Sequence, residues 1–110
     1  MNANEKILVT GGKGLVGSAL VEHLRSEGFS NVIALGREDC DLTDTVSTRL
    51  YFEAHQPTYV FHSAARVYGI MGNIKNKALS FFDNVTINTN VVDAAQRVGV
   101  KKITDRKSVV

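Results

Sequence analysis

The feature that most constrains the fold is a glycine-rich turn between an apolar run and an amphipathic segment. The run 6–10, Lys-Ile-Leu-Val-Thr, has the continuous apolar character of a strand buried on both faces. Gly11, Gly14 and Gly17 follow at intervals of three residues, and apolar residues at helical spacing begin at Leu15. A strand, a glycine turn and a helix in this order are typical of a phosphate-binding turn.

The rest of the chain alternates in the same way. Further strands are predicted at 31–35 and 58–62, a second helix is predicted after the cap Asp44, and a long helix is predicted from about Ala78. Residues 100–103 look like the start of a fourth strand. Alternating strands and helices predict an α/β fold, a Rossmann-type doubly wound parallel sheet with strand order 3-2-1-4. We expect this chain to hold its first half, with the fourth strand incomplete.

Composition excludes several classes of protein. The 110 residues correspond to one domain at most, and a formal net charge of +2 argues against a nucleic-acid partner. No apolar run approaches the ~20 residues of a membrane span. The single cysteine, Cys40, excludes an internal disulfide and is typical of the reducing cytoplasm. No spacing resembles a zinc site, so no metal is expected, and His62 is expected to be a satisfied core histidine.

Each glycine of the turn has a physical role. Gly11 permits the tight turn, Gly14 lets a pyrophosphate approach the backbone because it has no Cβ, and Gly17 lets the helix pack close to the strand. The start of that helix, Leu15 and Val16, offers unpaired N–H groups and a positive dipole end to the same pyrophosphate. A glycine-rich turn without a ligand is the alternative, but the strand before it and the helix after it favour dinucleotide binding.

The end of the second predicted strand distinguishes two cofactors. NAD sites place an acid there, whereas this chain has Gly36 and Arg37. An arginine suits the 2′-phosphate of NADP, and Lys13 adds a second cation on the same side. We therefore predict NADP. Glu38 and Asp39 keep NAD open, since a shift of one residue would put a carboxylate at the ribose, and each cation alone could equally be a solvated surface charge.

Asp41 precedes the second predicted helix. An ionised carboxylate only accepts hydrogen bonds, and the exocyclic amine of adenine only donates them. Asp41 is therefore a candidate partner of the adenine, whereas Asp44 is better explained as the cap of the helix.

Several segments together resemble a known family. The segments 10–17 (TGGKGLVG), 41–42 (DL) and 62–65 (HSAA) resemble the extended short-chain dehydrogenases/reductases, or NAD-dependent epimerases/dehydratases. Segment 64–73 (AARVYGIMGN) and the long-helix segment 82–95 are similar to the GDP-L-fucose synthase subgroup. The resemblance covers residues 6–103.

The resemblance implies which residues contact the cofactor. Lys13 and Arg37 match positions that contact the 2′-phosphate, Asp41 and Leu42 match the adenine site, and residues 64–66 would lie along the ribose and phosphates. The cofactor-binding residues predicted in all are Gly11, Lys13, Gly14, Leu15, Val16, Gly17, Arg37, Asp41, Leu42, Ala64, Ala65 and Arg66.

The resemblance also implies a function for the parent protein. It would be a homodimeric, NADP-dependent epimerase or reductase of a nucleotide sugar. Arg66 and Tyr68 replace a lysine and a glycine of the subgroup, which leaves the sugar open. The family's chemistry needs a Ser and a Tyr-x-x-x-Lys pair, and no such pair occurs here. We therefore predict no catalytic residue and an inactive chain. A non-catalytic redox-sensor module that binds a dinucleotide is the alternative.

The last six residues, 105–110, read Asp-Arg-Lys-Ser-Val-Val. The start of a common sequencing-library adapter encodes the same residues in one reading frame, followed by a stop codon. We therefore predict that residues 1–104 are the N-terminal part of a dinucleotide-binding Rossmann domain and that 105–110 are a non-native tail. A natural short polar C-terminus is the alternative.

Overall fold

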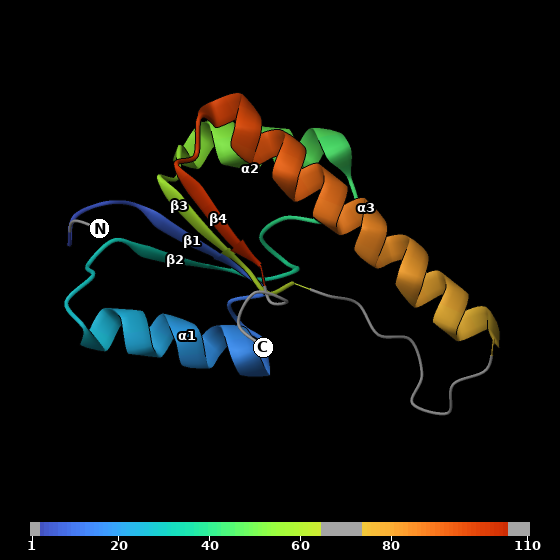
Figure 1. The fold of residues 1–110 in the computed structure, drawn as a ribbon, viewed down its shortest axis with the longest axis horizontal. Coiled ribbons are helices and arrows are strands. Elements are labelled where there is room, and N and C mark those ends of the chain that lie inside the picture. Colours follow the sequence, from blue (N-terminus) through green and yellow to red (C-terminus); the bar gives the residue numbers. More distant parts are fainter. Residues whose placement is uncertain (1–2, 65–73, 106–110) are drawn as a thin grey trace.

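The structure, a computed structural model, describes residues 3–64 and 74–105. Strands and helices alternate along the whole described chain (Figure 1). The elements are β1 (Ile7–Thr10), α1 (Leu15–Ser26), β2 (Val32–Leu35), α2 (Thr45–His55), β3 (Tyr59–His62), α3 (Ile74–Val98) and β4 (Lys102–Asp105). The predicted Rossmann-type α/β fold is therefore confirmed. Of the tail predicted as non-native, Asp105 is the last residue of β4, and 106–110 lie outside the described residues.

The strands form one parallel sheet in the order β2-β1-β3-β4. The predicted order 3-2-1-4 is therefore wrong. Figure 1 shows α1 on one face of the sheet and α2 with α3 on the other. Right-handed crossovers step in opposite directions when their helices lie on opposite faces. The crossover through α2 therefore carries the chain back past β1, so that β3 pairs with β1 rather than with β2.

The fourth strand begins and ends two residues later than the predicted segment 100–103. Thr104 and Asp105 continue it and pair with Phe61 and His62, which gives β4 four residues, as in each of the other strands. The expectation of an incomplete strand was wrong because the pairing runs the full length of β3.

The central strand β1 divides its side chains between two cores. Leu8 packs with Phe52 of α2 and Val91 of α3. Ile7 and Val9 point to the opposite face and pack among α1 residues. These three side chains, like Thr10 at the end of the strand, are fully buried, as expected for a parallel strand covered by helices on both faces.

Polar contacts fix α2 and α3 against each other. Asp44 caps α2 by accepting hydrogen bonds from the backbone N–H groups of the first turn, as predicted. Asp93 of α3 bridges Arg49 of α2 at 2.9 Å and Arg97 of its own helix at 3.0 Å.

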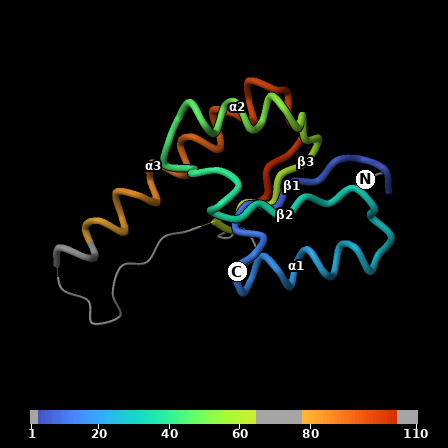
Figure 2. Tube along the Cα trace, turned by 180° about the vertical axis from the view of Figure 1, so that it is seen from behind, coloured from blue at the N-terminus to red at the C-terminus, as the bar shows by residue number. Residues whose placement is uncertain are grey.

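The view from behind in Figure 2 shows that the N-terminal part of α3 extends beyond α2. No helix within the two described ranges is long and apolar enough to cross a membrane.

Candidate functional site

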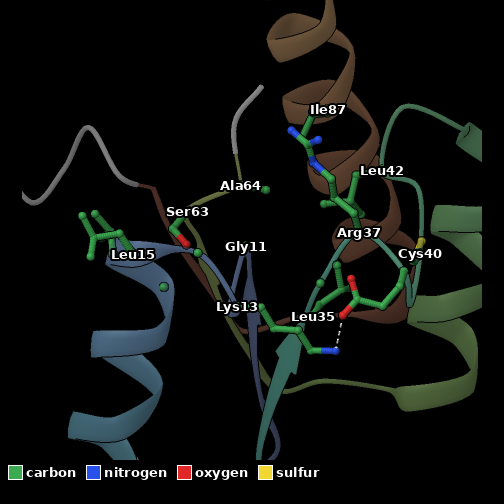
Figure 3. A pocket seen from close by; sticks show the side chains of 15 residues that line it. Gly11, Lys13, Leu15, Leu35, Arg37, Cys40, Leu42, Ser63, Ala64 and Ile87 are labelled. Atoms are coloured by element: carbon green, nitrogen blue, oxygen red, sulfur yellow. Dashed lines mark hydrogen bonds and ion pairs between the residues drawn. The ribbon is translucent and has the colours of Figure 1, made fainter. Parts of the chain in front are cut away.

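A pocket of about 500 Å³ opens where β1, β2 and β3 end (Figure 3). Ligands of open α/β sheets bind at this edge, beyond the carboxyl ends of the strands. The pocket is lined by Gly11, Lys13, Gly14, Leu15, Val16, Gly17, Leu35, Gly36, Arg37, Glu38, Cys40, Leu42, Ser63, Ala64 and Ile87.

The structure brings together most of the residues predicted to bind a cofactor. Ten of the predicted residues are described, and all of them except Asp41 line this pocket. Asp41 borders a neighbouring hollow, and one of its carboxylate oxygens accepts hydrogen bonds from the backbone N–H and the hydroxyl of Thr43. Ala65 and Arg66 lie outside the described residues. The binding role of all these residues stays a prediction.

Of the glycines at 11, 14 and 17, two are packed too tightly to carry a side chain. Gly11 has a φ of +64°, and a Cβ there would lie 2.9 Å from Cα of Ala64. A Cβ at Gly17 would lie 2.6 Å from the carbonyl carbon of Gly11 and closer still to its oxygen. At Gly14 the nearest heavy atom would be 3.4 Å away, which is an ordinary contact. Gly14 is therefore not needed for internal packing, and its open side faces the pocket.

The N-terminal end of α1 borders the same pocket. No side chain caps this end, since its N-cap residue is Gly14. Leu15 is 91% exposed, so that the first turn is open to solvent. The N–H groups and the positive dipole end of α1 are therefore available to an anion.

Lys13 and Arg37, predicted to act together, extend in different directions. Lys13 Nζ lies 2.5 Å from Glu38 Oε1 and 3.1 Å from Asp39 Oδ2. In Figure 3 Arg37 points toward Ile87 instead. No hydrogen bond or ion pair to a described residue engages the Arg37 side chain. The structure therefore gives Lys13 an anionic partner and leaves the exposed guanidinium of Arg37 available.

Titration within this group follows from the contacts. The hydrogen bond from Lys13 lowers the pKa of Glu38, and the hydrogen bond to Glu38 raises the pKa of Lys13. The pKa of Asp39 is also lowered, first by the N–H of Gly36, which donates to Oδ2 at 2.8 Å, and then by Lys13. All three side chains are therefore charged at neutral pH.

A hydrogen-bonded chain of side chains from β1, β3 and α3 lies behind the pocket. The backbone N–H groups of Ser63 and Ala64 donate to Thr10 Oγ1, so the Thr10 hydroxyl hydrogen is directed to His62 Nδ1 at 2.6 Å. His62 Nε2–H then donates to Asn88 Oδ1 at 2.7 Å. His62 is 4% exposed, so the expectation of a satisfied core histidine is confirmed.

Sequence reasoning missed several residues that shape the site. Ile87 lines the pocket from α3, and Asn90 donates to the carbonyl of Leu42 at 2.9 Å while accepting from Thr45. Cys40 is buried at the pocket, and burial raises the pKa of its thiol, which keeps it protonated at neutral pH. For Asn90 the sequence offered one signal, a polar residue at helical spacing between Ile87 and Ala94. No cluster of three or more metal-ligating side chains occurs in the described part of the chain.

Comparison with known proteins matches nearly the whole chain to one family. Residues 7–108 match the NAD dependent epimerase/dehydratase family. A GDP-L-fucose synthase of Dictyostelium discoideum is 42% identical over 98 residues, which cover 87% of this chain and 31% of that protein. This chain therefore spans less than a third of the length of that relative.

Two solved structures resemble the fold closely. The GDP-L-fucose synthetase of Naegleria fowleri bound to NADP has a TM-score of 0.84 and 37% identity, and the match covers 96% of this chain and 32% of the other. A GDP-mannoheptose C4 reductase of Campylobacter jejuni with NADP bound has a TM-score of 0.88 and 33% identity, covering 96% and 33%.

Proposed function

Since the chain belongs to the NAD dependent epimerase/dehydratase family, we propose that it is the cofactor-binding part of an NADP-dependent oxidoreductase of GDP-linked sugars. The observation that carries the proposal is the pocket at the ends of β1, β2 and β3. It combines a glycine turn that excludes side chains, an uncapped helix end and an exposed arginine. The glycine turn and the helix end suit a pyrophosphate, and the arginine suits a 2′-phosphate.

The residues present fit such a cofactor. Gly14 and the first turn of α1 would hold the pyrophosphate, because the backbone is open there and the helix dipole favours negative charge. Arg37 would bind the 2′-phosphate through charge-assisted hydrogen bonds. Ser63 and Ala64 would lie along the ribose, held by the hydrogen bonds of Thr10. The cofactor would supply the hydride, and the residues of this chain would bind and orient the cofactor.

The GDP-sugar part of the proposal is supported by the names of the relatives. The Dictyostelium protein, the Naegleria protein and the Campylobacter reductase all carry GDP-linked sugars in their names. Residues 65–73, where the sequence departs from the subgroup at Arg66 and Tyr68, lie outside the described residues. We propose that catalysis depends on a Ser and a Tyr-x-x-x-Lys pair in the parent protein, and that these 110 residues alone bind cofactor without turnover.

We further propose that the parent protein is a homodimer in the cytoplasm. The exposed aromatic side chains of Phe81 and Phe82 on α3 offer an apolar surface to a second copy. The free thiol of Cys40 is compatible with a reducing compartment.

Binding measurements with NADPH and NADH test the cofactor assignment. NADPH is expected to bind the chain more tightly than NADH in titrations followed by nucleotide fluorescence. Arg37→Ala should weaken NADPH by about 10- to 100-fold, the value of one or two charge-assisted hydrogen bonds, and change NADH by less than about twofold. Arg97→Ala removes the same charge outside the pocket and is the matched control. Equal losses of NADPH and NADH on Arg37→Ala would refute its role at the 2′-phosphate.

A further inference from the structure

We propose that Glu38 is a specificity-determining residue of the pocket, which competes with a 2′-phosphate for Lys13 and thereby weakens the preference for NADPH over NADH. This inference rests on the cofactor binding proposed above. It concerns Glu38, which is neither part of the glycine turn nor one of the cations predicted to bind the 2′-phosphate.

The contact between Lys13 and Glu38 spans two loops. Lys13 belongs to the glycine turn after β1, and Glu38 follows the end of β2. The two side chains meet over Gly36, where a Cβ would lie 2.6 Å from Cδ of Lys13 and 2.8 Å from Oε1 of Glu38. Both side chains therefore lie close over Gly36, which has no side chain of its own, and the dashed line at Lys13 in Figure 3 marks their contact.

The charges within this group oppose a phosphate. Lys13 faces two carboxylates, those of Glu38 and Asp39, so the three side chains together carry a net charge of −1 at neutral pH. A 2′-phosphate that binds Lys13 must displace a carboxylate and then lie beside it. Like charges at such distances repel, and the loss falls on NADPH alone, since the 2′-hydroxyl of NADH is neutral and does not require Lys13.

Glu38 is the carboxylate that can be exchanged. Asp39 is held by the N–H of Gly36 as well as by Lys13, and its side chain is 35% exposed. The Glu38 side chain is 65% exposed. Glu38 can therefore swing into solvent when a phosphate arrives, whereas Asp39 is fixed by the loop that it closes.

The test compares Glu38→Gln and Glu38→Ala with the unchanged 110-residue chain, using NADPH and NADH as probes. Both substitutions are expected to tighten NADPH about two- to fivefold, the value of one exposed ion pair, and to leave NADH unchanged. Glu22→Gln, an exposed position on α1 outside the pocket, makes the same change in net charge and should alter neither affinity. In a Lys13→Gln background the gain in NADPH affinity on Glu38→Gln should be smaller, because only the direct repulsion between Glu38 and the phosphate remains.

Three results would overturn the inference while leaving the proposed function intact. These are an unchanged or weaker NADPH affinity in both Glu38 variants, an equal gain for NADH, and an undiminished gain in the Lys13→Gln background. If the unchanged chain binds neither nucleotide, the proposed function fails, and the inference fails with it. Circular dichroism of each variant checks that the fold is retained.

Discussion

Replacing Gly17 with alanine tests the tightest point of the glycine turn. Gly17 lies in the first turn of α1, where an alanine would ordinarily stabilise the helix by about 0.5–1 kcal/mol. Its Cβ would, however, overlap the backbone of Gly11 and lie 2.9 Å from Cα of Gly12. Both neighbours are backbone atoms, which cannot rotate away as the end of a side chain can.

The size of the effect follows from what must move. Opening the turn costs about 1–3 kcal/mol as overpacking. The same movement strains two backbone hydrogen bonds, from Gly14 N–H to Gly11 O and from Gly12 N–H to Leu35 O, each worth about 1 kcal/mol. After the helix gain is subtracted, the free energy of unfolding should fall by about 2–4 kcal/mol. That is a large part of the ~5–15 kcal/mol typical of a small domain.

Urea unfolding followed by circular dichroism measures the change as a shift in midpoint at constant slope. Gly14→Ala is the matched control, because its Cβ would meet Gly11 O at an ordinary 3.4 Å and its φ of −81° suits alanine. We expect that control to lose about 0.5–1 kcal/mol, because Gly14 is the N-cap of α1 and alanine is a poorer N-cap than glycine. A Gly17→Ala chain as stable as the control, or more stable, would refute the packing argument, because helix propensity would then have decided the sign.

His62→Ala should lower the free energy of unfolding by about 2–4 kcal/mol, because it removes two short hydrogen bonds, one buried and one partly buried, and strips partners from Thr10 and Asn88. A loss below about 1 kcal/mol in the same urea experiment would contradict the hydrogen-bonded chain. The pH dependence of stability should involve Asp93, whose pKa is lowered first by Arg49 and then by Arg97. Its contribution is present above the ordinary pKa of 3.8 and is lost as the pH falls through the lowered value. Asp93→Asn should therefore be less stable than the unchanged chain at neutral pH, and the gap should close in acid; a gap that does not change with pH would contradict the ion pairs.

The sequence predicted the elements well because each has a local signal. The apolar run before Gly11 and the cap at Asp44 are fixed by neighbouring residues, and the structure places a strand and a helix there. Strand order has no such signal. It depends on which face of the sheet α2 covers, and that is decided by packing among Leu8, Phe52 and Val91, which are far apart in the sequence.

Part of the candidate site could also be predicted from the sequence, and part could not. The glycine turn follows from spacing, so its place in the pocket was predictable. The direction of a long charged side chain does not follow from spacing, and Lys13 is therefore found with Glu38 rather than beside Arg37. The link from Thr10 through His62 to Asn88 joins three elements across 78 positions of the chain and has no sequence pattern.

The pairing of β1 limits where the chain can change length during evolution. Each β1 residue is paired on both sides, as Leu8 is with Ile33 and Val60. One residue inserted between Leu8 and Val9, with Val9 held in register, would turn Leu8 toward α1 and Ile7 toward α2 and α3, so that both cores would receive the wrong side chains at once. Neighbouring strands cannot correct the error, because each is itself aligned to β1. Insertions and deletions in this family are therefore expected in connections such as 36–44, where Arg37 and Glu38 lie, so that the loop proposed to set the preference between NADPH and NADH is also the part most free to vary.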